Sequence, residues 1–345
     1  MKEVKFITAL PDETYYTWQV HLWLESLKEI NKSQHAIVLI YRAFNKKIDS
    51  KWHQIQELYP EAEFNYIQAR KEDNMNIYVG IYIPIIRSYC MWRHLKSNPS
   101  LGTTNVLFFC DSDILFSKKF NIDKFIEDDI NYVSDAVNYL GAEYFENKIK
   151  DVLSDKLEKY KHRDVLAELL SIVGISKDRA IENQENSGGV QYILKNSTAS
   201  YWNKVMNNSL IICTYMQKVN REYFPSQEIG YQSWCSDMWG ILWNLWFADK
   251  EVKVIPELNF SWGSCKIEQL EKSTIFHNAG ITGETMVDEQ GTHLCFYKGK
   301  YHNGDDPTKD PMLDKIIKSK KSQKYCTWYY AKKLKELSKK YKLNY

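Results

Sequence analysis

Two aspartates one residue apart, Asp111 and Asp113, are the residues whose types and spacing most clearly suggest chemistry. They follow the apolar segment 106–110, which predicts a buried strand. Open α/β sheets bind ligands outside the carboxyl ends of their strands, so both carboxylates are expected at a ligand-binding edge. Carboxylate oxygens bind hard divalent cations, and such cations bridge phosphates. The pattern therefore suggests a cation that holds a phosphorylated ligand, although a capped turn would also accommodate Asp-x-Asp.

A histidine far along the chain, His277, is the second candidate. It follows a predicted strand over 273–276 and precedes Asn278, Ala279 and Gly280. Imidazole suits Mn²⁺ better than Mg²⁺ or Ca²⁺, so a histidine at a strand end could complete a mixed oxygen and nitrogen site with the two acids. A lone histidine is, however, more often an ordinary core or surface residue.

The third candidate, Asp237, lies in a predicted helix over 232–247 whose other residues are mostly apolar or aromatic. Burying a carboxylate on such a background is costly unless it has partners or a task. The alternative is that Ser236 or Asp237 caps a helix that starts at this point.

Cations and tryptophans supply weaker candidates. Arg87, Lys298 and Lys300 could bind phosphates, although each resembles an ordinary surface cation. Four tryptophans near Asp237 could stack on sugar rings, yet spacing of three and four residues is typical of core packing, and most are expected to be core. They are Trp234, Trp239, Trp243 and Trp246.

Strands and helices alternate over the first hundred residues, which predicts a doubly wound parallel sheet. Asp12 or Thr14 is expected to cap the first helix. Adjacent glycines, Gly188 and Gly189, open a strand and would let the backbone approach a ligand closely. The expected strands are 4–10, 36–41, 63–67, 106–110, 132–137, 190–194, 252–255 and 273–276, and the later helices are 51–58, 76–96, about 144–175 and 232–247.

The composition suits a folded domain, because 44% of the 345 residues are hydrophobic and 14% aromatic. A net charge of +2 predicts neither wholesale nucleic-acid binding nor a membrane surface. The basic, aromatic segment 315–342 is expected to be a solvated terminal helix, with contact to an anionic surface as the alternative. Seven scattered cysteines without Cys-x-x-Cys spacing, no signal peptide and no long apolar run predict a cytoplasmic protein without integral membrane association.

Four segments together resemble the GT-A fold, nucleotide-sugar-dependent glycosyltransferases over about residues 4 to 302. They are Asp111-Ser112-Asp113, the Gly188-Gly189 strand, Ser236-Asp237-Met238-Trp239 and Phe276-His277-Asn278-Ala279-Gly280. The resemblance implies a GT-A-like, Rossmann-type, mostly parallel sheet flanked by helices, with a C-terminal helical tail. It divides the chain into a transferase domain, 1–304, with a helical insertion at about 144–180, and a tail, 305–345. Trp18-Gln19-Val20 and Tyr82-Ile83-Pro84 also resemble enzymes of plants and algae that glycosylate hydroxyproline or serine, and uncharacterised phage and bacterial proteins.

The resemblance assigns Asp111, Asp113 and His277 to Mn²⁺, or Mg²⁺, on the diphosphate of a donor, with UDP as the expected carrier. A hexosyl or pentosyl group would move to the hydroxyl of a glycan, protein or nucleic acid. If configuration inverts, Asp237 is the candidate base; if it is retained, which the likeness favours, the leaving phosphate takes the proton. The implied donor-binding residues are Thr8, Ala9, Leu10, Arg87, Ser112, Asp135, Asn186, Ser187, Gly188, Gly189, Asn278, Gly280, Lys298 and Lys300.

Three other functions stay open. A haloacid-dehalogenase-type phosphatase also places Asp-x-Asp at a strand end, with the first acid as nucleophile, but normally on its first strand. A sugar nucleotidyltransferase would carry a Gly-rich loop after its first strand, where this chain has Thr8-Ala9-Leu10-Pro11. A non-enzymatic carbohydrate-binding protein would explain the aromatic residues but would not need the acids and the histidine together.

Overall fold

The computed structural model describes residues 2–46, 48–279, 287 and 293–345, and the chain forms two compact units. The α1 unit contains Phe6–Tyr66, Cys110–Ile122 and Glu257–Tyr345. The α11 unit contains Met1–Lys5, Ile67–Phe109 and Asp123–Pro256. Each unit is therefore built from segments that are far apart in the sequence.

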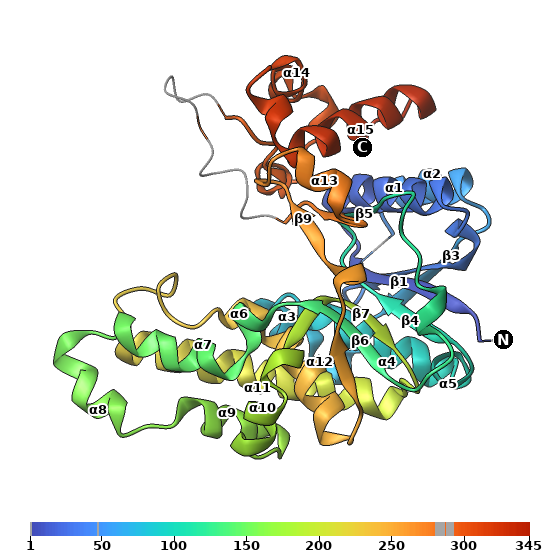
Figure 1. Ribbon diagram of the computed structural model, residues 1–345. Coiled ribbons are helices and arrows are strands. Elements are labelled where there is room, and N and C mark those ends of the chain that lie inside the picture. Colours follow the sequence, from blue (N-terminus) through green and yellow to red (C-terminus); the bar gives the residue numbers. More distant parts are fainter. Residues whose placement is uncertain (1, 47, 280–286, 288–292) are drawn as a thin grey trace. The chain divides into compact units, whose positions relative to one another are not determined.

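Parallel strands and two covering helices form the first part of the α1 unit (Figure 1). Strand β1 (Val4–Pro11) pairs in parallel with β2 (Ala36–Arg42), in a register that places Phe6 opposite Ala36. Strand β3 (Glu63–Gln68) neighbours β2, and helices α1 (Thr14–Glu29) and α2 (Ser50–Leu58) connect the three strands. Almost every residue of β1 and β2 is buried, as expected for strands covered by helices.

A second, smaller sheet of the α1 unit joins two distant parts of the chain. Strand β5 (Ile114–Phe116) directly follows the two aspartates, and β10 (Ile275–His277) pairs with it in antiparallel fashion. On its other edge β10 pairs in parallel with β9 (Phe260–Trp262). The register of β10 and β5 places His277 opposite Ile114. His277 is thus the last residue of its strand, whereas the sequence predicted a strand that ends one residue earlier.

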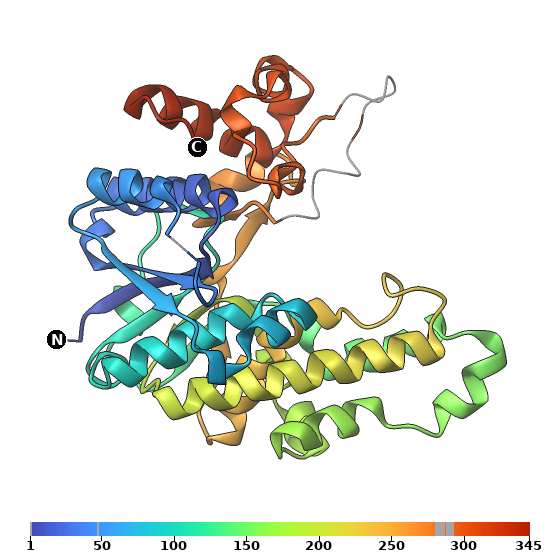
Figure 2. The ribbon, with the colours of Figure 1, turned by 180° about the vertical axis from the view of Figure 1, so that it is seen from behind.

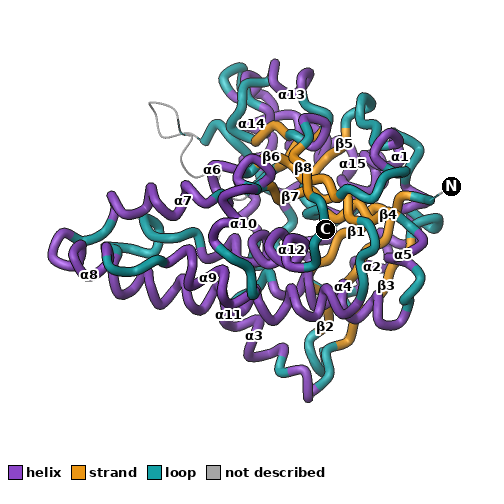
Figure 3. Tube along the Cα trace, turned by 60° about the horizontal axis from the view of Figure 1, so that its bottom comes forward, coloured by secondary structure: helices purple, strands orange, loops and turns teal. Residues whose placement is uncertain are grey.

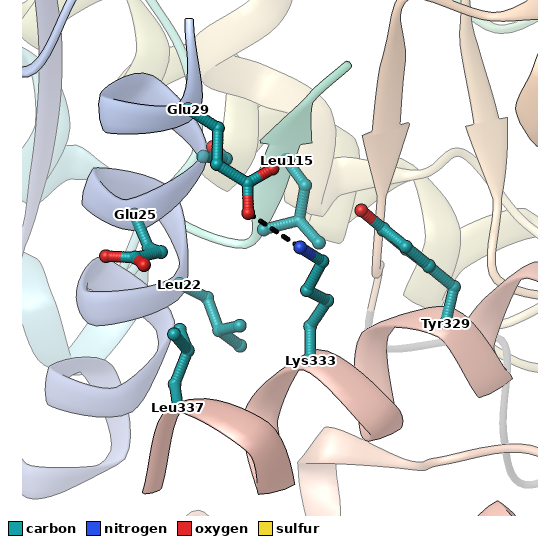
Figure 4. A pocket seen from close by; sticks show the side chains of 8 residues that line it. Leu22, Glu25, Glu29, Leu115, Tyr329, Lys333 and Leu337 are labelled. Atoms are coloured by element: carbon teal, nitrogen blue, oxygen red, sulfur yellow. Dashed lines mark hydrogen bonds and ion pairs between the residues drawn. The ribbon is translucent and has the colours of Figure 1, made fainter. Parts of the chain in front are cut away.

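The C-terminal part of the α1 unit contains three helices. They are α13 (Glu268–Lys272), α14 (Pro311–Lys318) and α15 (Cys326–Tyr341). Helix α15 packs against α1, and α14 packs against α15. Figure 4 shows side chains of α1 facing those of α15, with an ion pair of 2.6 Å between Glu29 and Lys333. Tyr330 and Leu334 of α15 are fully buried. The predicted terminal helix is therefore solvated on one face only.

The strands of the α11 unit complete the main sheet. Strand β7 (Gly188–Leu194) is antiparallel to both β4 (Val106–Phe109) and β6 (Asn131–Asp135), and β8 (Val252–Val254) runs parallel to β6. The order of the seven strands is β3-β2-β1-β4-β7-β6-β8. The mostly parallel α/β sheet flanked by helices, with C-terminal helices, is confirmed, with β7 as the antiparallel exception.

Helix α11 (Ala199–Tyr223) packs against α4 (Ile85–Ser97) and α12 (Ser236–Phe247) (Figure 2). Short helices α7, α8 and α9 run beside α11 and occupy the predicted helical stretch near 144–175 (Figure 3). Among the described residues, no helix is long and apolar enough to span a membrane. The short helices of this unit are α3 (Met75–Ile81), α5 (Leu101–Thr104), α6 (Val137–Leu140), α7 (Ala142–Asn147), α8 (Leu157–Lys161), α9 (Val165–Val173) and α10 (Lys177–Glu182).

Two local predictions are wrong. The helix expected over 76–96 is broken into α3 and α4, because proline at position 84 disfavours helical geometry in the preceding residue. Neither Asp12 nor Thr14 caps α1: its N-cap is Glu13, which makes no side-chain capping bond. The buried Asp12 instead accepts a hydrogen bond of 2.9 Å from Trp52 Nε1.

The buried imidazole of His21 makes the stability of the protein depend on pH. Burial, with smaller contributions from nearby lysines, lowers the pKa of His21 from 6.5 to about 4, although Glu25 opposes the shift. The unfolded chain therefore binds a proton between these pH values that the folded chain does not bind. We expect the free energy of unfolding to fall as the pH drops from about 6.5 to about 4.

This expectation can be measured by urea denaturation over that pH range. His21→Gln should make the slope of stability against pH shallower, whereas His162→Gln, at an exposed position, should leave it as in the wild type. Equal slopes for all three proteins would contradict the assignment to His21.

Candidate active site

Two acids and a histidine from separate segments form a cluster in the α1 unit. Asp111 and Asp113 lie in the turn between β4 and β5, and His277 ends β10. His277 Nε2 is 3.3 Å from Asp113 Oδ1 and 3.7 Å from Asp111 Oδ2. Asp113 and His277 are buried, and the Asp111 side chain is 31% exposed. The structure thus brings together the three residues that the sequence analysis proposed as metal ligands.

The pairing of β10 with β5 accounts for this proximity. His277 lies opposite Ile114, which directly follows Asp113, and Asn278 N donates a hydrogen bond of 3.1 Å to the backbone oxygen of Asp113. The imidazole stacks on the ring of Trp262, with 5.3 Å between ring centroids and an interplanar angle of 24°. Pairing and stacking together hold Nε2 toward the carboxylates.

The charge of Asp113 is compensated within the cluster. Burial by itself would raise the pKa of this carboxyl, but Lys298 and His277 lower it well below its ordinary value. The Lys298 ammonium forms an ion pair with Asp113 Oδ2, while His277 lies beside Oδ1. Asp113 is therefore ionised, which is the state that binds a cation.

The donor atoms of the cluster fit a divalent cation. One atom from each of Asp111, Asp113 and His277 lies within 4.8 Å of the other two. Ligands around an octahedral cation at about 2.1 Å are roughly 3.0 to 4.2 Å apart, which is close to the observed spacing. Two carboxylate oxygens and one imidazole nitrogen suit Mn²⁺ or a similar metal.

A second cluster in the α11 unit surrounds Asp237. Arg87 Nη1 forms an ion pair of 2.7 Å with Asp237 Oδ2, and the Tyr82 hydroxyl lies 2.9 Å from Oδ1. The same hydroxyl accepts a hydrogen bond of 2.8 Å from the backbone N–H of Asp237. The Arg87 guanidinium also lies over the ring of Phe109, 4.8 Å from its centroid. Arg87, proposed from the sequence as a phosphate ligand, is thus a partner of Asp237.

The structure rules out the capping alternative for Asp237. Helix α12 begins at Ser236, so Asp237 lies within its first turn, and Cys235 is the N-cap. The Ser236 hydroxyl donates to the Ser233 carbonyl at 2.6 Å. Asp237 is 3% exposed, and its carboxylate serves Tyr82 and Arg87. Tyr82 was not among the residues predicted to contact Asp237. The nearby Pro84 was a local signal that the helix breaks there.

Most of the remaining predicted donor-binding residues of the α1 unit are buried. Thr8, Ala9 and Leu10 lie inside β1, and Ser112 and Asn278 lie beside the acid and histidine cluster. Lys298 contacts Asp113, whereas Lys300 forms an ion pair of 2.6 Å with Asp310. Gly280 lies outside the described residues. Ligand binding by all of these residues stays a prediction.

The predicted glycine segment has a packing role in the α11 unit. A Cβ on Gly188 would come within 2.2 Å of the Val133 side chain, and one on Gly189 within 2.7 Å of Met238. Gly188 pairs with Asp135 at the end of β6. Nearby Asn186 accepts a hydrogen bond from Val254 N at 3.3 Å, and Ser187 is buried with no hydrogen-bond partner for its hydroxyl among the described residues.

A pocket of about 490 Å³ lies beyond the carboxyl end of β1, in the α1 unit. The rings of Tyr15 and His302 are 4.2 Å apart, centroid to centroid, in its lining. Neither residue belongs to a recognisable sequence motif: Tyr15 lies in the first turn of α1, and His302 follows the 3₁₀ turn Lys298–Tyr301. Its other lining residues are Asp12, Glu13, Thr14, Lys46, Asp49, Asn303 and Gly304.

The cluster generates a prediction about metal binding. His277→Ala and Asp113→Asn should each weaken Mn²⁺ binding, because each removes a ligand at a sheet edge with little loss of core volume. The loss of free Mn²⁺ signal in electron paramagnetic resonance measures binding directly, and the rise in thermal midpoint with Mn²⁺ measures it independently.

The matched control for this experiment is Glu268→Ala, which removes an exposed carboxylate of the same unit. It should bind Mn²⁺ as the wild type does. Wild-type binding in both cluster variants would show that the ion binds elsewhere.

No protein-family model matches the chain, and no curated protein matches it. Solved structures of low identity do match. Mouse xyloside xylosyltransferase 1 in its apo form is 10% identical with a TM-score of 0.34, over 81% of this chain and 98% of that one. The galactosyltransferase LgtC, in complex with donor and acceptor sugar analogs, is 11% identical with a TM-score of 0.41, over 87% and 94%. Core-mannan synthase A from Aspergillus fumigatus, in a Mn/GDP form, is 10% identical with a TM-score of 0.32, over 71% and 70%.

Proposed function

We propose that this chain is a metal-dependent glycosyltransferase that moves a sugar from a nucleotide-sugar donor, expected to be a UDP-sugar, to an acceptor hydroxyl. The observation that carries the proposal is the cluster of Asp111, Asp113 and His277 at the carboxyl end of β4, with Lys298 beside it. The sequence resemblance to GT-A glycosyltransferases supports the same function.

The residues of the cluster have distinct roles in this proposal. Asp111, Asp113 and His277 would hold Mn²⁺ or Mg²⁺, and a divalent cation there would neutralise charge on the departing diphosphate. Lys298, which is ion-paired with Asp113, stabilises the same growing charge once the donor is bound. The bond from the anomeric carbon to the diphosphate breaks, and a bond from that carbon to the acceptor oxygen forms.

Asp237 is assigned to the sugar. Both oxygens of its carboxylate have partners within the chain, because Oδ2 is ion-paired with Arg87 and Oδ1 lies beside the Tyr82 hydroxyl. These contacts support a role in orienting a sugar hydroxyl, with the leaving phosphate as proton acceptor. The proposal therefore favours retention of configuration over inversion with Asp237 as base.

The other functions make different demands on the same residues. A phosphatase with Asp111 as nucleophile does not require that His277 and Lys298 both contact the carboxylate of Asp113. A sugar nucleotidyltransferase lacks its Gly-rich loop in this chain. A carbohydrate-binding protein does not need a buried, charge-compensated acid beside an imidazole. Each function predicts a different product in the assay that follows.

The first test is hydrolysis of nucleotide sugars, which transferases catalyse slowly when water replaces the acceptor. We expect release of the nucleoside diphosphate from one UDP-sugar of a panel with Mn²⁺, and none after addition of EDTA. A thermal-shift screen with Mn²⁺ selects the donor, because a ligand that binds only the folded state raises its stability. Hydrolysis of phosphomonoesters alone, or formation of a nucleotide sugar from a sugar phosphate, would overturn the proposal.

The second test concerns Asp237. Asp237→Asn should lower turnover by on the order of a hundredfold or more while donor binding, measured by thermal shift, stays near the wild-type value, because the change removes charge and keeps shape. Asp249→Asn, at an exposed position just after α12, is the control and should turn over as the wild type does. Wild-type turnover in Asp237→Asn would reduce Asp237 to a structural partner of Arg87.

A further inference from the structure

One tryptophan of this chain is exposed where its neighbours are buried. Trp234 is 53% exposed, whereas Trp239, Trp243 and Trp246, which follow it in α12, are each at most 2% exposed. The expectation that most of these tryptophans form the core is thus confirmed for three of the four. A large indole left in water forgoes burial free energy, which a ligand stacked on it would recover.

The backbone of Trp234 is held beside Asp237. Trp234 lies in a 3₁₀ turn, Ser233–Cys235, that leads directly into α12. The Tyr82 hydroxyl lies 2.8 Å from the Trp234 carbonyl oxygen and 2.9 Å from Asp237 Oδ1. Because one hydroxyl contacts both groups, the turn that carries the indole and the carboxylate of Asp237 have a defined spacing.

Exposed apolar side chains flank Tyr82, whose hydroxyl contacts this turn. Ile81 and Ile83, on either side of Tyr82, are 43% and 52% exposed. The segment 224–238 contains no lysine or arginine, and Glu228 and Asp237 are its charged residues. A nucleic-acid strand stacked on Trp234 would need several cations for its phosphates, whereas this segment supplies none and the neighbouring Arg87 is ion-paired with Asp237. A neutral ligand with a flat apolar face suits the turn better.

We propose that Trp234 is the platform on which a pyranose ring of a carbohydrate acceptor stacks. The proposal rests on the function proposed above and names its acceptor class. A pyranose presents a face of C–H groups that packs on an indole, and a rim of hydroxyls that bind charged and polar groups. Trp234 offers the flat face, and the Arg87 and Asp237 pair offers charged partners in the same unit.

Saccharide binding is tested by saturation-transfer NMR on the complete chain with Mn²⁺ and UDP. The probes are methyl glycosides of glucose, galactose, mannose and xylose, with cellobiose and lactose, and the open-chain polyol sorbitol as a ligand without a ring face. At least one cyclic saccharide should bind the wild type and sorbitol should not. Trp234→Ala should weaken that binding by on the order of tenfold, as loss of an aromatic anchor does.

The matched control is Phe247→Ala, which removes an aromatic side chain that is 45% exposed at the other end of α12. It should bind saccharides as the wild type does, and thermal midpoints check that both variants fold. Equal saccharide binding by Trp234→Ala and wild type, no binding of any cyclic probe, or transfer to a serine peptide that does not depend on Trp234, would each overturn the proposal.

The experiments distinguish failure of the Trp234 proposal from failure of the proposed glycosyltransferase function. Nucleotide-sugar hydrolysis by the wild type is measured without any acceptor, so hydrolysis without Trp234-dependent saccharide binding would overturn the platform alone. Trp234-dependent binding without hydrolysis would instead support the saccharide site and overturn the transferase.

Discussion

A buried carboxylate must be compensated by nearby charge, and the carboxylate of Asp113 imposes this requirement on the α1 unit. The compensation comes from Lys298 and His277, which are both more than 160 residues away along the chain. Pairing of strand β10 with β5 brings His277 to Asp113, and Lys298 comes from the 3₁₀ turn Lys298–Tyr301. The same groups keep the carboxylate of Asp113 ionised in the folded chain, which is the state that the proposed cation site requires.

The carboxylate of Asp237 in the α11 unit is also buried, and a different set of residues compensates its charge. Its partners come from the break between α3 and α4. Tyr82 lies in the break, and Arg87 lies in the first turn of α4. Helix α11 packs against both α4 and α12, which holds the two partners near Asp237. The exposed indole of Trp234 depends on this arrangement, because Tyr82 also contacts its backbone.

The sequence predicted well where the physical signal is local. Apolar segments of suitable length gave β1, β2, β4 and β10 within one or two residues, because burial on both faces leaves a continuous apolar run. Helix α11 was missed, although it is the longest helix among the described residues. Its mixture of asparagine, tyrosine and threonine favours no element strongly, and its packing between α4 and α12 decides its structure.

The sequence by itself determined that two acids follow a buried strand and that a histidine ends another, since alternation and apolar length are properties of neighbouring residues. Only the tertiary structure decided that His277 lies beside those acids. It also decided that Arg87 forms an ion pair with Asp237 and Lys300 one with Asp310. It further decided which tryptophan stays in water. These outcomes depend on strand pairing and helix packing between distant segments, and no local pattern encodes which distant segment a residue will contact.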